Sequence, residues 1–133
     1  MTRCARGEFV VSLKPLMFEG ADPEFGFARM SIDKQISGDL TASTVGQMLS
    51  ATTSTEGSAG YVAIERVAGV LQGKRGAFVL QHTGSMNRGA PALVVTVVPD
   101  SGTEELVGLE GEFKIHIDEG KHFYEFTYRL PAQ

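Results

Sequence analysis

Glu65 and His82 are the residues of this sequence best suited to acid–base chemistry. Glu65 lies on the same side of an alternating run as Val67, and His82 on the same side as Leu80. Because the apolar side of such a run faces the core, both polar groups are expected to point inward. The turn between the runs permits two registers, with Glu65 opposite His82 or one diagonal step away, and both keep the side chains within reach.

A buried carboxylate beside an imidazole can take up and return a proton near neutral pH. The neighbouring carboxylate raises the pKa of the imidazole, whereas burial favours the neutral form of each group. The alternative is a structural Glu–His or Glu–Lys pair, in which the two side chains only balance each other's charge and hydrogen bonds. A different interpretation of the same runs puts Val62, Ile64 and Val79 inside. We favour it less, because it would also bury Arg66 and Gln81.

Further polar residues are expected on neighbouring inner faces. Lys34 lies between Ile32 and Ile36, where it could anchor a ligand carboxylate or oxyanion, or instead pair with Glu65 or extend to the barrel mouth. Residues 40–50 place mostly small side chains inward, which favours a pocket over a solid core. The candidate ligand-binding residues are Lys34, Tyr61, Thr44, Met48 and Tyr124. The tyrosines have a simpler alternative as core rings with a satisfied hydroxyl.

The elements that would position these residues are β-strands, since alternation with a period of two dominates the chain. Successive short hairpins give an up-and-down order, and closure into a barrel hides both edges of such a sheet. We therefore expect one soluble all-β domain over residues 1–133, a closed antiparallel eight-stranded barrel. The expected strands are 5–14, 27–36, 40–53, 60–71, 75–85, 92–98, 111–117 and 122–130.

The shared faces also predict a core and the absence of a metal site. The expected buried residues are Val67, Phe78, Leu80, Phe113, Ile115, Phe126 and Tyr128. His116 and His122 fall on opposite faces of the last hairpin, and no third ligand has metal spacing, so we expect no metal. Gly69 to Gly76 links two strands and opens no helix, so it is no phosphate loop, and we expect no cofactor.

Composition excludes several classes of protein. The formal net charge is -4 and the 12 Lys and Arg are dispersed, which argues against nucleic-acid binding. No apolar run is long enough to span a membrane, and the polar residues 1–8 do not resemble a signal peptide. A single cysteine, Cys4, cannot form an intrachain disulfide, so the expected location is the cytoplasm.

Several segments resemble a bacterial family of unknown function. They are Gly38 to Leu40, Gly60 to Val67, Gly76 to Gly84 and Val97 to Gly111, and together they extend over most of the chain. That family is grouped with the allene oxide cyclase-like barrels, whose eight-stranded relatives include plant cyclases and dirigent proteins. The resemblance implies the same barrel, and it implies no function. The sequence departs from the usual pattern at Ala68, Asp100 and Glu105, outside the expected pocket.

Two functions are compatible with this pattern. The favoured one is binding of a small, partly apolar molecule in the barrel interior. The alternative is an isomerase or cyclase in which Glu65 and His82 move protons, Lys34 stabilises negative charge and Tyr61 orients the substrate. A filled, purely structural barrel is a weaker third interpretation. We also expect a homodimer, because Phe123 and Val10 place apolar groups on polar outer faces.

Overall fold

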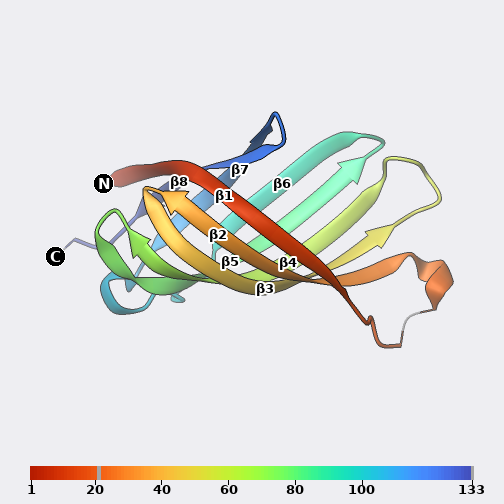
Figure 1. The fold of residues 1–133 in the computed structure, drawn as a ribbon, viewed down its shortest axis with the longest axis horizontal. Coiled ribbons are helices and arrows are strands. Elements are labelled where there is room, and N and C mark those ends of the chain that lie inside the picture. The colour runs from red at the N-terminus through yellow and green to blue at the C-terminus, as the bar shows by residue number, and fades with distance from the viewer. Residues whose placement is uncertain (21, 133) are drawn as a thin grey trace.

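The computed structural model describes residues 1–20 and 22–132, and these form a closed antiparallel barrel (Figure 1). Each strand pairs with the next along the chain, and β8 pairs with β1 to complete the wall. Two three-residue 3-10 turns, η1 (Pro23–Phe25) and η2 (Glu104–Leu106), interrupt the connections. The strands are β1 (Thr2–Leu16), β2 (Phe27–Gly38), β3 (Leu40–Thr52), β4 (Ala59–Leu71), β5 (Lys74–Asn87), β6 (Ala90–Val97), β7 (Glu110–Asp118) and β8 (Lys121–Arg129).

The predicted eight-stranded barrel is confirmed, with each expected strand present. The largest difference at a strand end is at β1, which begins at Thr2 rather than residue 5. The connection between the first two strands is shorter than the expected strands 5–14 and 27–36 imply, because β1 continues to Leu16. Ala21, in this connection, lies outside the described residues.

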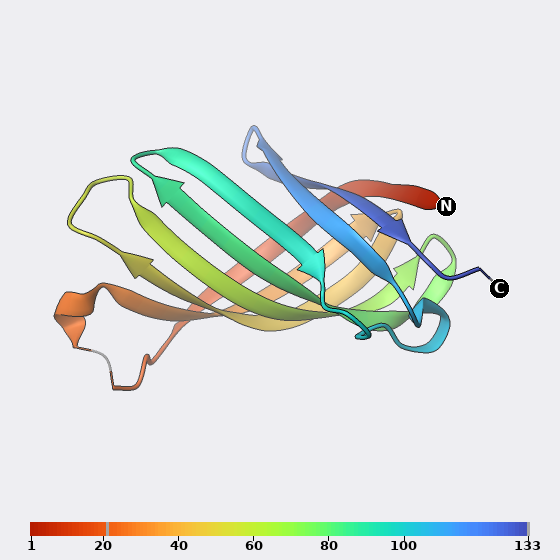
Figure 2. The same ribbon diagram turned by 180° about the vertical axis from the view of Figure 1, so that it is seen from behind.

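The two ends of the barrel differ, and we call them the base and the mouth. The base holds the start of β1 and the end of β8, and the mouth holds the β3–β4, β5–β6 and β7–β8 loops (Figure 1). Only one residue pair, Thr96 opposite Glu112, joins β6 to β7. Toward the mouth the β7–β8 hairpin diverges from the β5–β6 hairpin (Figure 2).

The base is sealed by the connection that contains η2. Its Thr103 exchanges two hydrogen bonds with Ala77 on β5, at 2.8 and 3.0 Å, along the part of β5 that β6 leaves unpaired. Leu106 is 1% exposed and packs over Gly76, where an added Cβ would lie 3.1 Å from its Cγ. The apolar core fills the barrel interior from this end.

The predicted core is confirmed for all but one residue. Val67, Phe78, Leu80, Phe113, Phe126 and Tyr128 are buried. Ile115 is only half-buried, because it lies farther toward the mouth on β7, beyond the single pair that joins this strand to β6. The interpretation that placed Val62 and Ile64 inside is wrong, since they are 52% and 53% exposed. Val79 is half-buried.

Candidate functional site

Glu65 lies at the centre of a buried polar cluster on the inner wall of β2 to β5. Its carboxylate oxygen Oε1 accepts a hydrogen bond from Lys34 Nζ at 3.0 Å and lies 2.7 Å from His82 Nε2. Glu65 is 0% exposed, His82 3% and Lys34 5%. Glu65 is paired with Leu80 and His82 with Ala63, so the diagonal register is the one that occurs.

A glycine on β3 lets this strand lie close to Glu65. Gly46 is the cross-strand partner of Glu65, and β3 separates β2 from β4. A Cβ built on Gly46 would lie 2.8 Å from the Glu65 Cβ and 2.3 Å from the Ile64 carbonyl oxygen. The missing side chain therefore allows β3 and β4 to approach each other closely beside Glu65.

The environment of Glu65 keeps it ionised. Burial raises the pKa of Glu65, but the hydrogen bond with His82, the charge of Lys34 and the Thr44 hydroxyl outweigh it and hold the pKa at about 2. The other carboxylate oxygen, Oε2, is buried without a hydrogen-bond partner among the described residues.

Lys34 is fully engaged within the cluster. Its ammonium lies over the Phe9 ring, 4.8 Å from the centroid, in addition to pairing with Glu65. Its backbone N–H donates to the Thr44 hydroxyl at 3.1 Å, which holds Thr44 at the edge of the cluster. The structure thus places Lys34 in the ion pair that the sequence offered as an alternative to a ligand anchor.

Tyr61 connects the cluster to the mouth. Its hydroxyl lies 3.4 Å from His82 Nδ1, on the side of the imidazole opposite Glu65. The ring crosses β5 at Gly84, where an added Cβ would lie 2.3 Å from Tyr61 Cε1. Burial, and then the charge of Glu65, raise the pKa of Tyr61, so it remains a neutral phenol at physiological pH.

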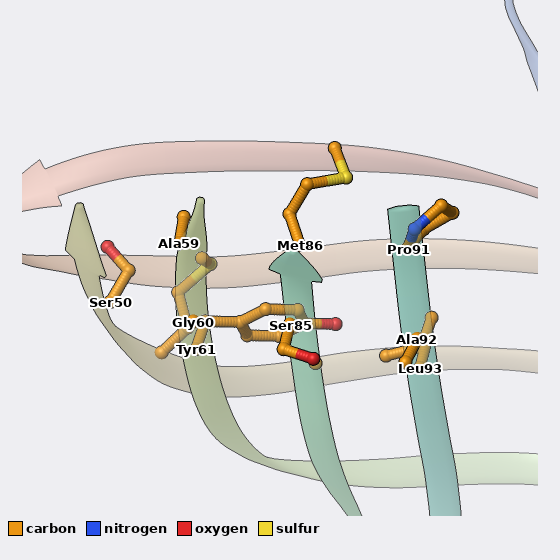
Figure 3. Close-up of a pocket in the computed structure, with 11 residues that line it drawn as sticks. Ser50, Ala59, Gly60, Tyr61, Ser85, Met86, Pro91, Ala92 and Leu93 are labelled. Atoms are coloured by element: carbon orange, nitrogen blue, oxygen red, sulfur yellow. The ribbon is translucent and has the colours of Figure 1, made fainter. Parts of the chain in front are cut away.

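A cavity of about 330 Å³ opens above Tyr61 at the mouth. Side chains from the ends of β3, β4, β5 and β6 surround it, as Figure 3 shows. Its lining residues are Met48, Ser50, Ala59, Gly60, Tyr61, Gly84, Ser85, Met86, Pro91, Ala92 and Leu93. None of them is charged, so within residues 1–20 and 22–132 the cavity wall is polar only at hydroxyls and backbone.

The sequence-predicted residues therefore divide into three groups. Met48 and Tyr61 line the cavity, whereas Lys34, Thr44, Glu65 and His82 form the buried cluster beneath it. Tyr124 belongs to neither group. Its hydroxyl donates to the Ser37 carbonyl at 2.8 Å and accepts from the Leu40 N–H at 2.9 Å, toward the base. That geometry gives Tyr124 the core role that the sequence left open.

Sequence reasoning missed most of the cavity wall. Ala59, Met86 and Leu93 lie on the inner faces, and the alternation that placed Tyr61 and His82 inward would have placed Ala59 and Met86 with them. The close contacts at Gly46 and Gly84 give no such signal, because they depend on which backbone or side-chain atoms pack against these glycines in the fold.

The histidines outside the cluster lie apart, as their alternation predicted. His116 is exposed, whereas His122 is half-buried with its ring centroid 5.1 Å from that of Phe9. Across the described residues, no group of three His, Cys, Asp or Glu side chains could hold a metal ion. The same residues contain no helix long and apolar enough to cross a membrane.

Fold and site together define a closed eight-stranded barrel with a cavity at its mouth and a buried Lys–Glu–His cluster beneath it. Residues 5–128 match the family described as protein of unknown function (DUF3224), and the chain belongs to this family. It is similar to the crystal structure of a DUF3224 protein of unknown function from Shewanella oneidensis MR-1, with 44% identity, complete coverage of both chains and a TM-score of 0.94. A comparison with curated proteins gives no match.

Proposed function

We propose that the barrel binds a small, uncharged and largely apolar molecule in its mouth cavity. The observation that carries this proposal is the cavity itself, formed on the inner ends of four adjacent strands and ending on Tyr61. Its volume of about 330 Å³ is at the small end of the range for ligand pockets. Met48, Met86 and Leu93 supply an apolar and adaptable wall.

The charge distribution supports an uncharged ligand. Lys34 and Glu65 neutralise each other below the cavity, so a charged ligand would lose hydration without gaining an ionic partner. A larger hollow of about 660 Å³ lies on the outer face of β1, β7 and β8, but exposed side chains such as Arg6, Lys114 and Glu125 surround it. That surface supports an apolar ligand less well.

A fluorescence titration with the uncharged apolar probe N-phenyl-1-naphthylamine tests the proposal. Ala59→Phe places a ring on the cavity wall and should abolish saturable binding. Ala51→Phe places the same ring on the outer face of β3, opposite Gly60 and Phe27, and should bind like the wild type. Saturable binding that is unchanged by Ala59→Phe would contradict the proposal.

A second candidate function, an isomerase or cyclase, is favoured by the line Glu65–His82–Tyr61. A substrate hydroxyl could pass its proton to the Tyr61 oxygen while Tyr61 passes its own to His82 Nδ1, and Glu65 would stabilise the resulting imidazolium. In an α-hydroxy ketone the hydrogen of the carbinol carbon then shifts as hydride to the adjacent carbonyl carbon, so that the ketone and the alkoxide exchange places. The protons return at the end of the reaction, so no co-reactant is required. We also propose that the protein is related to the allene oxide cyclase-like barrels and that it is located in the cytoplasm.

The second candidate can be tested with 2-hydroxy-1-phenylpropan-1-one, which isomerises by movement of hydrogen alone. Acceleration by the wild type, lost in Glu65→Gln while probe binding is retained, would support proton transfer, because the amide keeps the shape of the carboxylate and loses the negative charge that stabilises the imidazolium. Without acceleration by the wild type, the candidate fails for α-hydroxy ketones and the binding function stands.

A further inference from the structure

Tyr61 is the residue through which the buried cluster can form a hydrogen bond with a ligand in the mouth cavity. Of Lys34, Glu65, His82 and Tyr61, only Tyr61 lines the mouth cavity. The direction of the hydrogen bond between Tyr61 and His82 therefore decides whether the cavity presents a donor or an acceptor. That direction follows from the charges farther inside.

The ionised Glu65 fixes one proton of His82. A carboxylate can only accept hydrogen bonds, and Oε1 lies 2.7 Å from His82 Nε2. Nε2 must therefore carry a proton. The ammonium of Lys34 already balances the charge of Glu65 at 3.0 Å, so a second proton on His82 would leave a net positive charge in a buried site.

With a neutral His82, the ring nitrogen that faces Tyr61 has no proton. His82 Nδ1 then accepts, and the Tyr61 hydroxyl, 3.4 Å away, donates to it. The Tyr61 proton is occupied, and its oxygen presents only lone pairs to the cavity. The raised pKa of Tyr61 agrees with a neutral phenol in this role.

We propose that the mouth cavity selects ligands that donate a hydrogen bond to Tyr61: uncharged, largely apolar molecules that carry a hydroxyl or N–H group. An acceptor-only ligand would leave the Tyr61 oxygen unpaired or draw its proton away from His82 Nδ1, which would leave a buried lone pair without a donor. This inference rests on the proposed binding function and specifies its ligand class.

Two probes of similar shape separate donors from acceptors. 1-Naphthol carries a hydroxyl, and 1-methoxynaphthalene replaces its proton with a methyl group. Wild-type protein should bind 1-naphthol roughly three- to tenfold more tightly, the effect of one net hydrogen bond. Tyr61→Phe removes the acceptor and should bind the two probes equally.

The possible outcomes distinguish this inference from the proposed binding function on which it rests. Equal affinities in the wild type, or a preference that persists in Tyr61→Phe, would overturn the donor selection while leaving the cavity as a binding site. Absence of binding by both probes would overturn the proposed function and this inference together.

The ring ¹⁵N NMR signals of His82 at pH 7 give an independent readout that requires no ligand. We expect a proton on Nε2 and none on Nδ1, the arrangement in which Tyr61 donates to His82. A proton on Nδ1 would reverse the direction of the Tyr61 hydrogen bond and overturn the inference.

Discussion

Glu65 links the stability of the barrel to pH. Its pKa of about 2 in the folded protein lies below the ordinary value of 4.5, so the folded state binds its proton less readily than the unfolded chain does. The contribution to stability is therefore complete above about pH 4.5 and is lost as the pH falls toward 2. This difference in pKa corresponds to roughly 3 kcal/mol.

Urea unfolding at pH 5 and pH 2.5 measures this contribution. The wild type should lose more stability over this interval than Glu65→Gln, which cannot titrate. Glu110→Gln is the control, because Glu110 pairs with Arg129 on the exposed surface and contributes little. Equal pH dependence of the wild type and Glu65→Gln would show that Glu65 does not carry the acid sensitivity.

Gly46 is predicted to be required for the close approach of β3 to β4 beside Glu65. In Gly46→Ala the new methyl group would meet the backbone and Cβ of Glu65, neither of which can move without shifting β4. We expect destabilisation of about 1–3 kcal/mol by strain, measured by thermal unfolding. Gly60→Ala is the control, since its nearest neighbour is 3.7 Å away; an equal effect of both changes would contradict this role.

At the scale of elements, alternation was sufficient to predict every strand, because one face of each strand packs on the core. The register of β4 and β5 was left open because the turn at Gln72 and Gly73 gives an ambiguous signal. Both residues have positive φ, 45° and 87°, and glutamine is not a residue that usually indicates such a turn. The role of Tyr124 was left open because its hydroxyl contacts Leu40 and Ser37, which are 84 and 87 positions away in the sequence.

The η2 connection is predicted to stabilise the base through Leu106. Leu106 is fully buried over Gly76, so Leu106→Ala should destabilise the protein by about 2–5 kcal/mol. Its neighbour Val107 is 62% exposed, and Val107→Ala should change stability by less than about 0.5 kcal/mol. Similar melting temperatures for the two variants would show that η2 does not contribute to the core.

At the scale of the whole molecule, the homodimer remains a prediction, but the structure directs it to another surface. Phe123 is half-buried and Val10 is isolated, whereas Phe27, Leu49, Val62 and Ile64 form an exposed apolar strip on the outer face of β2 to β4. Next to this strip on β3, the exposed Val45 lies between Asp33 on β2 and Arg66 on β4. A two-fold axis parallel to β3 would place Asp33 of each copy against Arg66 of the other.

Charge reversal with light scattering tests this arrangement. Arg66→Asp should shift the protein from dimer to monomer, and the double variant Asp33→Arg/Arg66→Asp should restore the dimer. Lys114→Asp, on the outer face of β7, should leave the dimer unchanged. A wild type that is monomeric at high micromolar concentration, or a double variant that stays monomeric, would contradict the proposed interface.

The location of the cavity could not be predicted from alternation, because which end of the barrel stays open depends on how the connection before β7 packs on β5.

The position of a bound ligand tests the central claim most directly. A crystal structure of the wild type with 1-naphthol should show the probe among Met48, Met86 and Leu93, with its oxygen within hydrogen-bond distance of Tyr61. A probe bound only on the outer face, or a probe in the cavity with its oxygen directed away from Tyr61, would contradict the account.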